Sequence, residues 1–200
     1  MLPDWSLYLF HLIFWISFVV TLLVTRSRGQ RNSHDVSDAE ASPTELTAPN
    51  SRLLVAIHSL AFGVMYFGVG VAVIPNRIPT WFVGHQEFGA ALILAAAVVA
   101  CSALAVFQSW RLRAKISGGH VLATGGPFSY VRHPIYLSLN LLSLGTAIWI
   151  PSGFVWLGFV LMVIGSELRA RSEERLLAKA FGASYGIYCA RTRRFIPGIY

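Results

Sequence analysis

Residues 125–136 read GGPFSYVRHPIY, and this stretch decides where the last membrane segments of the chain begin. Pro134 has no backbone N–H, so it cannot extend a helix backward, but it can occupy the first position of one. His133 is pushed toward an extended conformation by the proline that follows it. We therefore expect the chain to arrive from a loop, turn at residues 132–134 and enter a helix. Irregular backbone at membrane depth must line a protein cavity, because lipid cannot satisfy its polar groups.

Composition places the chain in a bilayer. Its 200 residues are 55% hydrophobic and only 12% charged, with a mean hydropathy of +0.59, whereas soluble domains carry about 25% charged residues. The net charge of +7 fits topology signals and contact with anionic headgroups. Basic motifs interleaved with aromatic residues are absent, so no nucleic-acid partner is expected. Cys101 and Cys189 form neither a disulfide framework nor a metal-binding pattern.

The apolar runs predict an all-α integral membrane protein with about five transmembrane helices. The predicted spans are residues 5–25, 53–74, 88–107, 135–150 and 153–165. The last two reach only about 24 Å and 20 Å, so we predict a short helical hairpin that nearly or just spans the bilayer. Its second leg continues without a breaker to residue 181, and Gly182 is a plausible C-cap.

The chain divides into two predicted parts. Residues 1–110 hold the N-terminal transmembrane helices, with a polar mobile loop at 27–51. Residues 111–200 form a C-terminal core that begins with a basic, glycine-rich connection. Of the 16 Lys and Arg residues, only Arg77 falls on the other side when the spans alternate. The positive-inside rule then puts the N-terminus outside and the C-terminal helix in the cytoplasm.

Three polar residues have structural explanations as well as functional ones. His58 lies within the second span, where we expect it to bond to a neighbouring helix. Arg132, taken alone, fits a topology charge that faces headgroups, and Tyr136 fits an interfacial anchor.

The segment 166–181 carries a pair of opposite charges on its apolar side. At about 100° per residue, Arg169 and Glu173 fall within the apolar arc of the helix. Such a pair contributes a few tenths of a kcal/mol on a surface, but turning it toward packed protein costs several kcal/mol per ion unless partners compensate. The pattern favours a ligand site over a plain ion pair. The remaining charges are expected outside this arc: Arg171, Arg175 and Lys179 on the opposite face, flanked by Glu167 and Glu174.

The order of these motifs resembles the isoprenylcysteine carboxyl methyltransferase family of integral membrane methyltransferases. The resemblance runs from His120 to Pro197, and the first hundred residues share only their apolar character. It is carried by LATGGPFSYVRHPIY at 122–136, RARSEE at 169–174, FGASYGIY at 181–188 and RFIP at 194–197.

The resemblance implies an S-adenosylmethionine site at the cytoplasmic end of the helices. Glu173 is the expected cofactor carboxylate, and Arg169 is the expected substrate contact. Phe128 stands where relatives often have tyrosine, and Leu137-Ser138 stands where they often have a small residue and glycine. The other expected cofactor-binding residues are His120, Val121, Leu122, Ala123, Arg132, His133, Pro134, Ile135 and Tyr136.

Several reactions fit this site. Methyl transfer is an in-line displacement that depends on positioning and on exclusion of water. A carboxylate acceptor is already ionised at neutral pH, and Arg169 could orient it by a bidentate contact. An amine or thiol acceptor would need a base, for which His133 or His120 could serve. Arg169 and His133 are thus the expected catalytic residues.

The expected reaction is carboxyl methylation of a prenylcysteine-like compound that enters from the bilayer, among membrane lipids. N- or S-methylation of a phospholipid amine or a thiol is the alternative within this class. An Arg-His-Pro-x-Tyr sequence also occurs in membrane reductases of the sterol-reductase type, which use NADPH. A non-catalytic membrane scaffold is the third class.

Overall fold

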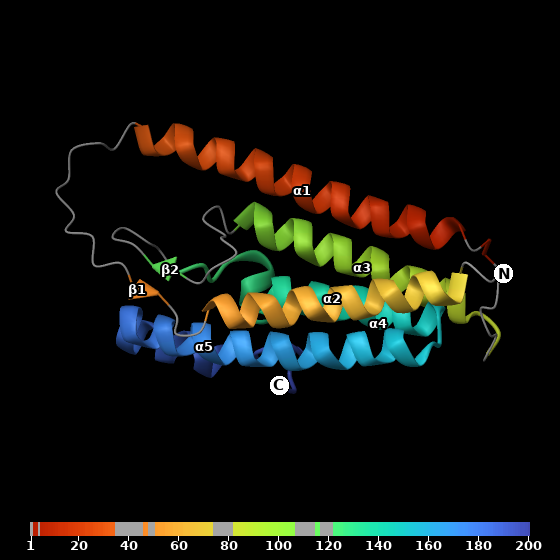
Figure 1. Cartoon of the computed structure of the whole chain (residues 1–200). Coiled ribbons are helices and arrows are strands. Elements are labelled where there is room, and N and C mark those ends of the chain that lie inside the picture. The colour runs from red at the N-terminus through yellow and green to blue at the C-terminus, as the bar shows by residue number, and fades with distance from the viewer. Residues whose placement is uncertain are drawn as a thin grey trace.

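The computed structural model describes residues 2–3, 5–34, 46–47, 51–73, 82–106, 115–116 and 122–200. Five α-helices make up most of this part of the chain (Figure 1). They are α1 (Trp5–His34), α2 (Ser51–Val73), α3 (His85–Val106), α4 (Pro134–Trp149) and α5 (Gly153–Arg191). A 3-10 turn, η1 (Gly126–Ser129), precedes α4, and two-residue strands β1 (Leu46–Thr47) and β2 (Lys115–Ile116) pair antiparallel.

The prediction of an all-α protein with about five membrane helices is confirmed. Among the residues that the structure describes, α1, α2, α3 and α5 are long and apolar enough to cross a membrane, and α4 is a shorter apolar helix. Its 16 residues extend about 24 Å, less than the ~30 Å of a hydrocarbon core. Both legs of the hairpin were predicted to be short, but only α4 is. Helix α5 runs for 39 residues, from its apolar start into its charged half.

Successive helices run in alternating directions (Figure 1). The start of α4 and the C-terminal half of α5 therefore lie at the same end of the helices, together with β1 and β2. The main contacts pair α3 with α4 and α2 with α5, and α1 packs on α3. Helices from before and after residue 110 are therefore packed against each other. The predicted division of the chain at residue 110 stays a prediction.

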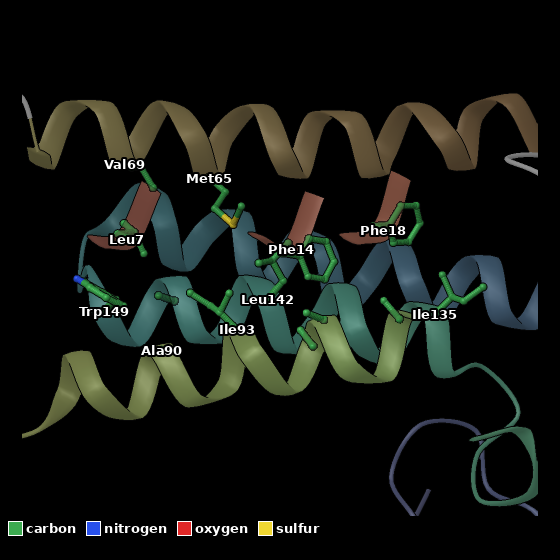
Figure 2. Close-up of a cluster of buried hydrophobic side chains, with 14 of the residues drawn as sticks. Leu7, Phe14, Phe18, Met65, Val69, Ala90, Ile93, Ile135, Leu142 and Trp149 are labelled. Carbon is green, nitrogen blue, oxygen red and sulfur yellow. The ribbon is translucent and has the colours of Figure 1, made fainter. Parts of the chain in front are cut away.

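An apolar core joins the helices along most of their length (Figure 2). Phe14 of α1, Met65 of α2 and Ile93 of α3 are each 0% exposed, as are Leu142 and Trp149 of α4. Alanines line α3 where it is most deeply buried, which lets its neighbours approach closely.

Glycine makes the closest helix contacts. The backbones of α3 and α4 touch at Gly89 and Gly145, where a Cβ on either residue would lie 2.7 Å from the carbonyl oxygen of the other. Gly68 lets α2 approach the first turn of α5 in the same way, against Phe154 and Val155. Each pair of helices is therefore held at a distance that only a residue without a side chain permits.

A buried histidine joins α2 to α5. His58 of α2 bonds through Nε2 to Ser166 Oγ of α5 at 3.3 Å, which confirms the prediction that it bonds to a neighbouring helix. Ser166 in turn donates to Asn140 Oδ1 of α4 at 3.0 Å. A histidine so placed satisfies its polar atoms inside an apolar bundle.

One predicted boundary was wrong. The polar segment 27–51 was expected to be a loop, but α1 continues as a helix to His34, since no proline interrupts it there. Residues 35–45 and 48–50 lie outside the described residues. The predicted helix end at Gly182 is confirmed: this residue takes a positive φ of 51° at a kink where one helix of α5 ends and a second begins. The chain then re-enters a helical turn and reaches Arg191.

Gly68→Ala is expected to destabilise the protein. The new Cβ would lie 2.7 Å from Phe154 Cβ and 2.8 Å from the Val155 backbone nitrogen, so α2 and α5 must separate at a cost of roughly 1–3 kcal/mol. The unfolding temperature in detergent should fall by roughly 3–10 °C. Gly70→Ala is the matched control in the same helix, because a Cβ there meets nothing within 4 Å. Equal losses from the two variants would contradict the close-contact explanation.

Candidate active site

The turn before α4 is held by the C-terminal segment of the chain. His133 has φ −125° and ψ 61°, outside the helical region, and Pro134 opens α4, as predicted. The backbone N–H groups of Arg132 and His133 donate to the carbonyl oxygens of Arg193 and Arg194 at 2.7 and 3.2 Å. The irregular backbone at 131–133 is thus satisfied by protein.

A cluster of cations surrounds Glu174. Arg132 Nε lies 3.0 Å from Glu174 Oε1, and Arg194 contacts both oxygens, through Nε at 3.1 Å and Nη2 at 2.6 Å. His133 Nε2 lies 3.2 Å from Oε1. The hydrogen bond to Glu174 raises the pKa of the Arg194 guanidinium above its ordinary value. These partners occupy both carboxylate oxygens, so Glu174 has little capacity left for a ligand.

Glu174 was expected to lie outside the apolar arc of the helix, but its side chain is largely covered by protein. Its side chain is only 16% exposed, less than that of Glu173 at 22%. A helical wheel of α5 takes no account of the turn at 131–133 or of the segment after Arg191. Both of these cover the helix on the side where Glu174 lies.

Glu173 has different surroundings from its neighbour. The Tyr136 hydroxyl donates to its Oε1, and Arg169 Nη2 lies 3.8 Å from the same oxygen. Its Oε2 lies 3.8 Å from His133 Nδ1, too far for a hydrogen bond. Within the described part of the chain, Oε2 accepts no hydrogen bond, so this carboxylate can still accept one from a ligand.

Arg169 is a buried cation beside this carboxylate. Its side chain is 8% exposed, and its Cζ lies 5.1 Å from the centre of the Tyr136 ring, a cation–π distance. The prediction that Arg169 and Glu173 face packed protein is confirmed.

An apolar wall closes one side of the charged groups. Tyr136, Ala170 and Phe195 are buried together. The His133 ring stacks on Tyr136 with 5.7 Å between centroids and lies 6.0 Å from Phe195. This wall lowers the access of water to the histidine, which is 6% exposed.

Polar groups continue from this end into the helices. The His58 ring lies 5.8 Å from Tyr136, and the bonds from His58 to Ser166 and from Ser166 to Asn140 follow one layer deeper. The charged end is thus joined to a line of hydrogen-bonded side chains from α2, α4 and α5.

The remaining predicted residues are spread more widely. His120 and Val121 lie outside the described residues. Leu122 precedes η1 without regular structure, whereas Ala123, Phe128 and Ile135 pack in the main apolar core. Pro134 is buried in the first turn of α4. The structure therefore brings together Arg132, His133, Tyr136, Arg169 and Glu173.

Sequence reasoning missed the parts played by Glu174, Arg194 and Phe195. No periodicity links a carboxylate of α5 to residues 20 positions later. The available signal was the RFIP motif at 194–197, which belongs to the resemblance but was given no role.

Glu174→Gln is expected to destabilise the folded chain, because Arg132 and Arg194 would then face a neutral amide. We expect a loss of about 2–3 kcal/mol, between the ~0–1 of exposed ion pairs and the 3–5 of buried ones. Chemical denaturation in detergent measures it. Glu173→Gln, one residue earlier, keeps an acceptor for Tyr136 and should cost less than half as much. A larger loss from Glu173→Gln would show that Glu174 does not hold these segments together.

Comparison with known proteins identifies the family. The family described as phospholipid methyltransferase matches residues 85–184, which is half of the chain. The match begins at the first residue of α3 and includes all five residues that the structure brings together. No curated protein matches the chain. The chain belongs to the phospholipid methyltransferase family.

Proposed function

We propose that this membrane methyltransferase uses S-adenosylmethionine and methylates the polar end of a lipophilic substrate. The observation that carries the proposal is the contrast between two adjacent carboxylates. Glu174 is occupied by two arginines and His133, whereas Glu173 keeps an oxygen without a hydrogen bond from the described residues. A carboxylate left open in this way beside a buried arginine is suited to a ligand.

The residues around Glu173 fit the proposed cofactor. S-adenosylmethionine carries an amino group and ribose hydroxyls, and these are donors that Glu173 Oε2 could accept. Tyr136 would hold the carboxylate in position, and Phe195 would exclude water. When bound, the cofactor supplies an electrophilic methyl group on a sulfonium.

Arg169 supports an anionic acceptor group. Its guanidinium offers a planar fork that matches a carboxylate, and its burial strengthens such a contact. We infer carboxyl methylation of a prenylcysteine-like compound as the preferred reaction, because a carboxylate needs no base. The family description favours a phospholipid instead. A phospholipid amine would have to lose a proton first, and His133 is the nearest base to Glu173.

We also propose that the site faces the cytoplasm and that the N-terminus lies outside. The alternating helices and the arginines gathered near the start of α4 support this orientation. Apolar substrate chains would remain in the bilayer while the polar end reaches Arg169.

Calorimetry on the purified protein distinguishes the three classes of function. S-adenosylhomocysteine should bind if the chain is a methyltransferase of this type. Binding of NADPH would indicate a reductase, and binding of neither would indicate a scaffold.

Glu173→Gln is expected to weaken cofactor binding roughly tenfold or more. The variant loses a charged acceptor whose hydrogen bond contributes about 1.5–3 kcal/mol. Titration with S-adenosylhomocysteine measures the change. Glu87→Gln makes the same replacement at an exposed position in the first turn of α3, at the opposite end of the helices, and should leave the affinity unchanged. Unchanged affinity in Glu173→Gln would remove Glu173 from the cofactor site.

Arg169→Lys is expected to separate cofactor binding from turnover. Lysine keeps the charge but loses the planar fork, so cofactor affinity should stay within a factor of a few. Turnover of a carboxylate substrate should fall tenfold or more, with each decade equal to about 1.4 kcal/mol. Both quantities can be measured on one purified variant. A parallel loss in both would show that Arg169 serves only as the partner of Glu173.

A further inference from the structure

One ring nitrogen of His133 lies beside the carboxylate of Glu174. An ionised carboxylate can only accept hydrogen bonds, and Glu174 Oε1 lies 3.2 Å from His133 Nε2. The hydrogen must therefore be on Nε2. Arg132 and Arg194 fix the carboxylate from two other directions, so the ring cannot exchange this partner without disturbing the cluster.

The opposite nitrogen of the ring is directed at Glu173. His133 Nδ1 lies 3.8 Å from Glu173 Oε2, which is longer than a hydrogen bond. Neither atom accepts or donates a hydrogen bond among the described residues. The His133 side chain is 5% exposed, so a largely buried ring faces a partly open carboxylate.

A neutral ring with N–H on Nε2 presents a lone pair at Nδ1. Nδ1 and Glu173 Oε2 are then two acceptors that face each other.

We propose that Glu174 is a positioning residue that fixes this tautomer, and that His133 Nδ1 and Glu173 Oε2 form an acceptor pair that binds an ammonium group. An ammonium carries several N–H donors and a positive charge, so it can bond to both acceptors and complement the carboxylate. The inference rests on the proposed function. It allows two sources for the ammonium: the amino group of the methyl donor, or the amine of a phospholipid headgroup.

The tautomer can be observed directly by nitrogen NMR. The chain contains six histidines, and the signals of His133 are assigned in the ¹⁵N-histidine-labelled protein by comparison with His133→Asn. With S-adenosylhomocysteine present, the expected result is a protonated Nε2 and an unprotonated Nδ1. A protonated Nδ1 would overturn the proposal.

Two variants separate positioning from general effects on the cluster. Glu174→Gln replaces an obligate acceptor by an amide that can also donate, so the proton should redistribute toward Nδ1, which can then bond to Glu173. Glu167→Gln also removes a charge that contacts Arg194, but it does not contact His133, and its spectrum should match that of the unaltered chain. The same tautomer in all three proteins would overturn the role of Glu174. If Glu174→Gln does not fold, the spectrum of the unaltered chain still decides the tautomer.

Calorimetry tests the ammonium and identifies its source. If the methyl donor supplies it, S-adenosylhomocysteine should bind roughly tenfold more tightly than its analogue without the amino group. This difference should shrink to about twofold or less in Glu173→Gln and in His133→Asn. If the two forms bind equally, a short-chain phospholipid with an ethanolamine headgroup should bind more tightly than the same lipid with an ethanol headgroup.

If the amino group raises the affinity of neither S-adenosylhomocysteine nor the phospholipid, the acceptor pair is overturned. That result differs from a failure of the proposed function, in which S-adenosylhomocysteine would not bind at all. In that case the comparison of the two lipids still tests the acceptor pair.

Discussion

The carboxylate of Glu174 is the interaction on which the site depends. It binds Arg132 in the turn before α4 and Arg194 after the end of α5, and it orients the ring of His133. Three segments that are far apart in the sequence thus meet at one side chain. An exposed ion pair would contribute little, but this carboxylate is largely covered, and removing any one partner leaves charges without compensation.

The two ends of the helices differ in the side chains that they bury. Toward the start of α5, glycine contacts and apolar side chains hold the helices close together. Toward the charged half of α5, polar side chains from α2, α4 and α5 replace the apolar ones. The reactive groups therefore sit on a rigid base, which is the arrangement that precise positioning of a methyl acceptor needs.

Much of the fold could be predicted from the sequence, because a bilayer imposes strong constraints on length and hydropathy. The apolar runs gave the five helices, and Pro134 gave the start of α4. The wheel placed Arg169 and Glu173 toward packed protein, since this depends on one helix alone. The importance of Glu174 could not be predicted in the same way. It depends on the backbone of residues 131–133 pairing with residues 193–194, a tertiary contact with no local signal.

The pairing of residues 131–133 with residues 193–194 also affects how the protein is made. Membrane helices insert in order as the chain leaves the ribosome, and α1 to α4 can be in place while the end of the chain is still being synthesised. Until Arg193 and Arg194 emerge, the N–H groups of Arg132 and His133 lack their carbonyl partners and Glu174 lacks one of its cations. The contacts of residues 193 and 194 therefore complete the candidate site, so a chain stalled before residue 193 is expected to be inserted in the membrane and yet to be inactive.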